Sequence, residues 1–172
     1  MLKDSLSVSL AAALLIVSNG NAQSGWPGAA CWGSNVNGQC NATAGLGAIA
    51  DVAAGGAHTV ALLPDGTIAC WGSNADGQCN TPNKLGGFIG IAAGSAHTVA
   101  IKVDNAVVCW GSNNQGQCDT PAKLGAVSRI AAGNAHTVAA KSDGSVACWG
   151  SNSRGQCDAP AKLSAVVEIA AG

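Results

Sequence analysis

A repeat of 39 residues governs the chain from residue 31 onward, and it constrains the fold more than any other feature. The string Cys-Trp-Gly-Ser-Asn begins at four positions, each 39 residues after the last: Cys31, Cys70, Cys109 and Cys148. Gly-Gln-Cys closes each of these segments, at Cys40, Cys79, Cys118 and Cys157. Ala-His-Thr-Val-Ala recurs with the same spacing around His58, His97 and His136. Several short motifs repeated in a fixed order indicate an array of equivalent units.

Each unit is predicted to contain four short strands. The β-branched residues in Ala57–Leu62 lead into the hairpin signal Pro64-Asp65-Gly66, and Thr67–Trp71 forms the returning strand. Ile91–Gly94 is the expected first strand of the next unit, and Gly116-Gln117-Cys118 its fourth. Four strands in about 40 residues are typical of a propeller blade. The sequence therefore predicts an all-β fold, a partial β-propeller of four-stranded blades.

The repeats supply about three full blades with half-blade pieces at both ends. Ala29–Cys40 is an isolated hairpin of a third and a fourth strand, and Val166–Ala171 is a single first strand. Truncation, a fragment, or a half-propeller that completes itself as a homo-oligomer would each explain this pattern, and truncation is preferred. One tryptophan in each unit is expected to wedge between adjacent blades: Trp32, Trp71, Trp110 and Trp149.

Residues 1–22 have the pattern of a secretory signal peptide, which leaves residues 23–172 for the propeller repeats. Lys3 gives a positive start, and the apolar run Leu10–Val17 is far shorter than the roughly 20 residues needed to span a bilayer. Gly20-Asn21-Ala22 places small residues at a cleavage site. A buried N-terminal helix is the alternative. We expect a secreted or periplasmic protein, in a compartment that permits disulfides.

The eight cysteines are expected to form one disulfide inside each unit, which uses every thiol: Cys31–Cys40, Cys70–Cys79, Cys109–Cys118 and Cys148–Cys157. Pairing between units, Cys40 with Cys70 and onward, would leave Cys31 and Cys157 unpaired. Zinc ligation is the rival interpretation, although the sequence has no Cys-x-x-Cys. Reactive-thiol chemistry is disfavoured because no activating base recurs beside the cysteines.

Composition and periodicity exclude several classes of function. The formal net charge is −1 and 10% of the residues are charged, so we expect no binding to nucleic acid and none to membranes after signal removal. The three histidines share one position in successive units. This favours a scaffold role, with each imidazole bonded to a neighbouring backbone group, over a three-histidine metal ring. No Ser-His-Asp set, carboxylate pair or phosphate loop breaks the period, so we expect no enzyme activity, cofactor or metal.

Two residues change in every copy of the Cys-Trp-Gly-Ser-Asn-x-x-Gly-Gln-Cys frame. They are Val36 and Asn37, Ala75 and Asp76, Asn114 and Gln115, and Ser153 and Arg154. Loops on one face of a rigid scaffold are the usual place for recognition, so these eight residues form the predicted partner-binding site. Neutral drift at tolerant loop positions is an equally weighted alternative.

The order of these motifs resembles the repeat of the regulator of chromosome condensation family. The similarity rests on Trp71-Gly72-Ser73-Asn74, Gly77-Gln78, Ala93-Gly94, His97-Thr98 and Asp65-Gly66, with their equivalents in the other copies. It covers essentially residues 25–172 and implies a seven-bladed propeller of four-stranded blades. The cysteine in Gly-Gln-Cys departs from the family, which often has other apolar residues there. Members share a scaffold more than an activity, so the resemblance does not fix the function.

We expect an exported, non-catalytic module that binds a protein partner. A proteinaceous inhibitor of an extracellular enzyme is the second hypothesis. Glycan or cell-surface binding is the third, and it is weakened because the chain has no tyrosine and no spare tryptophan for stacking on sugars. Guanine nucleotide exchange, known in the family, is not expected, because its target is intracellular and we expect this chain to be exported.

Overall fold

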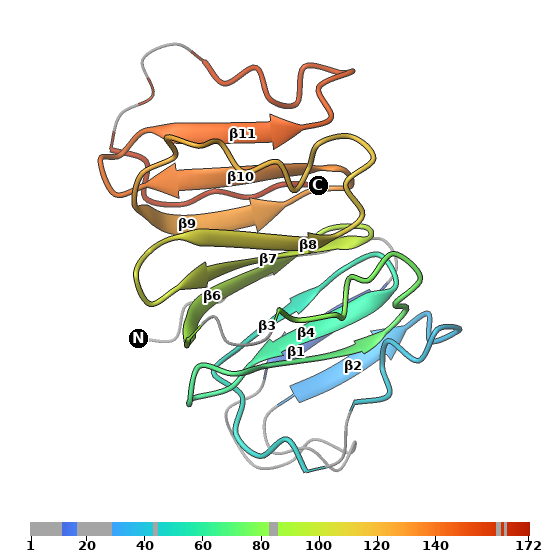
Figure 1. Ribbon diagram of the computed structural model, residues 1–172. Helices are drawn as coiled ribbons and strands as arrows, with labels where there is room; N and C mark the ends of the chain where they lie inside the picture. The colour runs from blue at the N-terminus through green and yellow to red at the C-terminus, as the bar shows by residue number, and fades with distance from the viewer. Residues whose placement is uncertain (1–11, 17–28, 43–44, 83–85, 161–162, 164) are drawn as a thin grey trace.

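Antiparallel sheets of similar size succeed one another along the molecule (Figure 1). The computed structural model describes residues 12–16, 29–42, 45–82, 86–160, 163 and 165–172, and these contain no helix. The strands are β1 (Ala12–Ile16), β2 (Ala29–Gly33), β3 (Asp51–Ala54), β4 (His58–Leu62), β5 (Ile68–Gly72), β6 (Phe88–Ala93), β7 (His97–Lys102), β8 (Val107–Gly111), β9 (Val127–Ala132), β10 (His136–Lys141) and β11 (Val146–Gly150). The all-β prediction is confirmed.

Three of the sheets repeat one topology, and we call them the first, second and third blades. Their strand orders are β3-β4-β5, β6-β7-β8 and β9-β10-β11. The register repeats as well, because His58, His97 and His136 lie opposite the last glycine of the third strand: Gly72, Gly111 and Gly150. The sequence period is therefore a period of the structure, and the prediction of a partial propeller is confirmed.

The turn between the second and third strands of each blade follows its sequence signal. Gly66 and Gly144 each have a φ of 81°, a conformation that glycine adopts without steric cost. Asn105 holds the same place in the second blade with a φ of 63°, and asparagine tolerates this left-handed region better than most residues. The Asp65 carboxylate closes the first of these turns by accepting the Thr67 backbone N–H at 2.9 Å.

The expected fourth strand is wrong, because Gly116-Gln117-Cys118 lies in two successive turns instead. The Gly116 N–H donates to the Asn113 carbonyl at 3.1 Å, and the Asp119 N–H donates to the Gly116 carbonyl at 3.0 Å. The disulfide from Cys118 to Cys109, with a sequence separation of 9, holds this segment folded back on β8. Each blade is thus a sheet of three strands followed by a compact, cross-linked loop.

The first strand expected at Val166–Ala171 is also absent from the sheets. The Val166 N–H donates to the Gly144 carbonyl at 3.2 Å, and the Gly172 carbonyl accepts from the Asn134 N–H at 3.4 Å. These bonds lay the segment against the third blade. In the described part of the chain no second strand pairs with it, so no ladder forms.

The segment β1 lies within the predicted signal peptide and pairs with β2. Ala12 lies opposite Gly33, the register that His58 and Gly72 show in the first blade. The hairpin expected to stand alone at Ala29–Cys40 therefore has a strand beside it. Removal of residues 1–22 stays a prediction, and the rest of that segment lies outside the described residues. The described part of the chain offers no helix that could cross a membrane.

The apolar core lies between neighbouring blades. One cluster joins the first blade to the second through Val60, Leu62, Phe88, Ile91, Ala100 and Trp110. A second cluster joins the second blade to the third through Ile101, Leu124, Val127, Ala139 and Trp149. The predicted tryptophan wedge is confirmed for Trp110 and Trp149, which are each 8% exposed. It is wrong for Trp32, which is 51% exposed because no blade of the described chain packs on it.

Candidate partner-binding site

Four cross-linked loops follow β2, β5, β8 and β11, and we call them the staple loops: residues 31–40, 70–79, 109–118 and 148–157. Each is closed by the disulfide predicted within its unit, with Cα atoms 5.4, 5.2, 5.0 and 5.2 Å apart. No cysteine of the described chain is free. These thiols are consumed in disulfides, so they are not available as zinc ligands or nucleophiles.

The constant residues of each staple loop build its frame. In the second loop the Asn74 side-chain amide donates to Asn80 Oδ1 at 2.8 Å, and Asn74 Oδ1 accepts the Cys79 N–H at 2.9 Å. The Gln78 side chain folds back, and its Oε1 accepts the backbone N–H of Asp76 at 3.0 Å. The same glutamine contact recurs at the other variable residues, Asn37, Gln115 and Arg154.

The variable residues therefore enter the frame only through their main chain. Their side chains are exposed in all four loops: Val36, Asn37, Ala75, Asp76, Asn114, Gln115, Ser153 and Arg154. The third strands all run toward the same side of the view in Figure 1, so the loops that follow them project from that side. The predicted site thus consists of four separate loop tips on a common scaffold, and each tip exposes two variable side chains. Among these eight side chains are one acid, Asp76, and one base, Arg154.

The predicted scaffold role of the histidines is supported, although their bonding partner differs from the expected one. His58 Nε2 lies 3.0 Å from Thr98 Oγ1 in the next blade, and His97 Nε2 lies 3.2 Å from Thr137 Oγ1. The Thr98 hydroxyl donates its only proton to the Gln78 carbonyl at 2.8 Å. It must therefore accept from His58, which fixes the imidazole as the tautomer protonated at Nε2. The expected backbone partner is a threonine side chain.

Burial keeps these imidazoles neutral. The pKa of His58 and of His97 is lowered to about 4, mainly by desolvation and to a smaller extent by the next histidine along the array. Gly94 allows the close packing, because a Cβ there would press on the His97 ring and lie 2.6 Å from the Gly133 carbonyl. Within the described residues no three His, Cys, Asp or Glu side chains are grouped to hold a metal ion.

The main-chain carbonyl of the frame glutamine joins each of the first three staple loops to the blade that follows. The Gln78 carbonyl accepts the Thr98 hydroxyl at 2.8 Å and the Trp110 indole N–H at 2.9 Å. The Gln39 carbonyl accepts Thr59 and Trp71 in the same way, at 2.8 Å each. We call this pattern the blade joint. In the third joint the Gln117 carbonyl accepts the Thr137 hydroxyl at 2.8 Å, but the Trp149 indole N–H has no hydrogen-bond partner in the described chain. The blade joint anchors the base of a staple loop in the core between blades while the tip of the loop stays exposed.

A family comparison accounts for this repeated arrangement. The model of the regulator of chromosome condensation (RCC1) repeat matches residues 49–78, 88–117 and 127–156, which is more than half of the chain. The chain belongs to this family. Each match begins near the first strand of a blade and ends in its staple loop, so the family repeat and the structural blade coincide. No curated protein matches the sequence.

Solved structures of RCC1-type proteins share the fold. Prp20p of Saccharomyces cerevisiae is 20% identical with a TM-score of 0.62, over 71% of this chain and 41% of its own. The ectodomain of the Physcomitrella patens receptor kinase CR4 is 24% identical with a TM-score of 0.67, over 84% and 41%. The ectodomain of the Arabidopsis thaliana receptor kinase ACR4 is 26% identical with a TM-score of 0.58, over 71% and 43%. The chain thus spans about two fifths of each structure.

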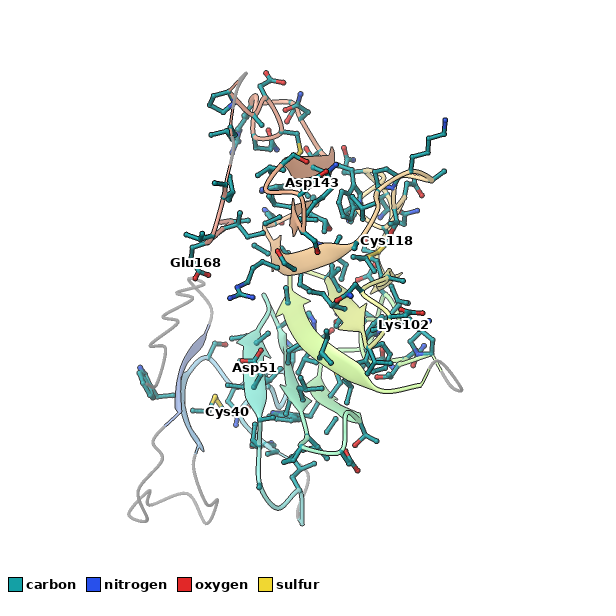
Figure 2. The ribbon with its side chains drawn as sticks, turned by 90° about the vertical axis from the view of Figure 1, so that its left-hand side faces the viewer. Cys40, Asp51, Lys102, Cys118, Asp143 and Glu168 are labelled. Atoms are coloured by element: carbon teal, nitrogen blue, oxygen red, sulfur yellow. A yellow bond between two sulfur atoms is a disulfide. The ribbon has the colours of Figure 1, made fainter. Side chains whose placement is uncertain are left out.

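One further variable position of the RCC1 repeats lies in the first strand, outside the loop frame. Aligning the first strands at the 39-residue period gives Asp51, Gly90, Arg129 and Glu168 at equivalent places. Figure 2 shows Asp51 and Glu168 on one side of the molecule, and Cys118 and Lys102 on the other. Burial raises the pKa of Asp51, against the effect of the Val52 N–H that its carboxylate accepts. The signal in the sequence is that this position changes from acid to glycine to base to acid along the period.

Proposed function

We propose that this protein is an exported, non-catalytic interaction module that binds a protein partner through the tips of its staple loops. The observation that carries the proposal is that the constant and the variable residues of each loop have different roles. The constant asparagine, glutamine and cysteine side chains are engaged in the frame, whereas the variable side chains are exposed. A surface that changes from copy to copy on an otherwise constant scaffold suits recognition.

Export is supported by the four disulfides, because such bonds persist in oxidising compartments and are rare in reducing ones. The short apolar segment near the start of the sequence agrees with export. A test is the N-terminal sequence of the protein recovered from outside the cytoplasm: a start at Gln23 supports the proposal, and an intact Met1 contradicts it.

A macromolecular partner fits the spread of the site over several loops. A standard protein interface buries about 800 Å² on each side, more than one loop tip offers. Prp20p has been described for its binding to Gsp1p and histones, which are proteins. An extracellular enzyme would be one class of partner for this chain, and the module would then act as an inhibitor. The periodic placement of the buried polar side chains supports a role without catalysis.

The test compares two triple variants against a partner isolated from the extracellular fluid of the source organism. Asp76→Ala, Gln115→Ala and Arg154→Ala together remove the variable side chains from three loop tips. They keep the main-chain hydrogen bonds by which these residues enter the frame. The matched control removes one base, one polar residue and one acid from other exposed positions: Lys123, Ser142 and Glu168. We expect the loop variant to weaken binding by about tenfold or more and the control to bind normally. Equal binding by both variants would sink the proposal.

A further inference from the structure

The tip of the first staple loop carries the dipeptide Asn37-Gly38. The loop frame places a glycine after the second variable residue in every copy, but only the first copy has an asparagine before it. Every other asparagine of the described chain precedes a residue that has a side chain. Asn37 is exposed, as are Asp76 and Gln115 at the same place in the interior loops, so its exposure does not depend on the ends of the array.

An asparagine followed by glycine can lose its side-chain amide in a reaction that needs only water. The main-chain nitrogen of Gly38 attacks Cγ of Asn37 and gives up its proton, and the side-chain nitrogen leaves as ammonia. Water then opens the cyclic imide. Cleavage of the new bond at Cγ yields aspartate, and cleavage at the main-chain carbonyl yields isoaspartate. Glycine favours the attack because it has no Cβ to hinder the approach of the nitrogen.

Two hydrogen bonds of the loop control the access of this nitrogen. The Gly38 N–H donates to the Asn35 carbonyl at 3.1 Å, and the Asn37 N–H donates to Gln39 Oε1 at 3.0 Å. The attack requires the first of these bonds to open, whereas the disulfide Cys31–Cys40 can stay closed. A hydrogen bond at an exposed loop tip opens at a small cost in free energy compared with one in the core. The folded loop therefore slows the reaction without preventing it.

The aspartate product has a counterpart in the second loop. Asp76 occupies the equivalent position, and its N–H donates to Gln78 Oε1 at 3.0 Å, the distance that Asn37 shows in the first loop. The Gly77 N–H donates to the Asn74 carbonyl at 3.1 Å, which also matches the first loop. An aspartate at position 37 is therefore compatible with the frame. Isoaspartate is not matched in this way, because it adds a methylene group to the main chain between the two bonded N–H groups.

We propose that Asn37 is a modification site, at which deamidation converts the neutral tip of the first staple loop into an acidic one. The product gains a carboxylate at an exposed position, so the surface formed by the loop tips gains one negative charge. The first loop then carries the same acid as the second, which has Asp76 in the equivalent place. The reaction needs no enzyme and its detection needs no partner, so this proposal stands or falls independently of the proposed function.

Isoelectric focusing and peptide mapping of the purified, disulfide-bonded protein test the proposal. During incubation at mildly alkaline pH, we expect a more acidic form to accumulate and the peptide that contains Asn37 to change from amide to acid. Peptide mapping separates this site from Asn19, which also precedes glycine in the sequence. Asn114 is the internal control: it is exposed but precedes Gln115, so it should remain an amide.

Asn37→Gln is the matched variant, because the third loop has glutamine in the equivalent place. The Gln115 N–H donates to Gln117 Oε1 at 2.8 Å, so the frame accepts this residue. The longer side chain would have to close a larger ring, and the variant should therefore lose the acidic form that arises at position 37. Asn37→Asp represents the aspartate product and should unfold at the Tm of the wild type.

An Asn37 that remains an amide in the folded protein overturns the proposal. Deamidation of the same residue in the reduced chain unfolded in urea would then show that the frame blocks the attack. An Asn37→Gln variant that yields the same acidic form also overturns the proposal, because the charge would then arise elsewhere. A lowered Tm of Asn37→Asp would contradict the claim that aspartate keeps the frame.

Discussion

Replacing Thr98 by valine tests the bond that links one blade to the next. Valine has nearly the shape of threonine, so the substitution removes the hydroxyl and little else. That hydroxyl accepts from His58 Nε2 at 3.0 Å and donates to the Gln78 carbonyl at 2.8 Å, and all of these atoms are in the core. The carbonyl keeps its bond from the Trp110 indole at 2.9 Å. The group left without a partner is the His58 N–H.

The expected loss of stability in Thr98→Val follows from the hydrogen bonds that the substitution removes. Losing the bond to the carbonyl costs about 1 kcal/mol, and a buried donor left without a partner costs about 1–3 kcal/mol more. The total loss in the free energy of unfolding is then about 2–4 kcal/mol. For a protein of this size each 1 kcal/mol lowers Tm by roughly 2–4 °C, so the shift is large enough to measure.

Thr59→Val is the matched control, and it separates the contribution of the histidine bond from that of the bond to the glutamine carbonyl. Thr59 holds the same strand position, is equally buried, and donates to the Gln39 carbonyl at 2.8 Å. In the described part of the chain no histidine reaches it. We expect Thr59→Val to cost about 1 kcal/mol. Thr137→Val should cost at least as much as Thr98→Val, because Thr137 pairs with His97 and the Trp149 indole N–H does not bond to the Gln117 carbonyl.

Urea denaturation followed by tryptophan fluorescence gives the three values under one condition. We expect Thr98→Val and Thr137→Val each to lower the free energy of unfolding by about 1–3 kcal/mol more than Thr59→Val does. If all three variants lose the same stability, the histidine contributes nothing to the joint and the reasoning is refuted.

Two further predictions concern the histidines and the disulfides. The pKa values of His58 and His97 in the folded protein, about 4, lie below the ordinary value of 6.5. The stability that the neutral imidazoles contribute is therefore complete above pH 6.5 and is lost as the pH falls toward 4. A urea midpoint that stays constant between pH 7 and pH 4 would contradict this. The double variant Cys109→Ser with Cys118→Ser should lower the free energy of unfolding by about 2.5–3 kcal/mol, from the chain entropy of its short loop. Titration of the native wild type should find no free thiol, and reactive thiols before reduction would argue against the stapled loops.

The period made most of the fold predictable because equivalent sequences in a repeat array occupy equivalent environments. The hairpin at Asp65-Gly66, the four disulfides and the wedge of Trp110 all followed from local motifs and their spacing. The Gly-Gln-Cys strand was wrong, because Gly116 has a φ of 76° and the segment forms two successive turns, which the disulfide to Cys109 cross-links to β8.

The contacts between neighbouring blades could not be predicted from the repeated sequence motifs. The pairing of His58 with Thr98 joins residues 40 positions apart, and it depends on how two sheets pack rather than on either strand alone. At the candidate site, the loop pattern separated the constant frame from the variable tips. It did not reveal that the Gln78 side chain holds the loop while its main-chain carbonyl holds the next blade. The exposure of Trp32 also depends on a neighbour and not on its own motif.

Site-specific photo-crosslinking tests the binding surface most directly. A benzophenone side chain is placed in turn at Asp76, Gln115 and Arg154 on the loop tips, and at exposed Lys123 as the control. The protein is then irradiated in the extracellular fluid of the source organism. Our account predicts one protein adduct shared by the three tip positions and absent at Lys123. An adduct that forms equally at Lys123, or at none of the tips, would contradict it.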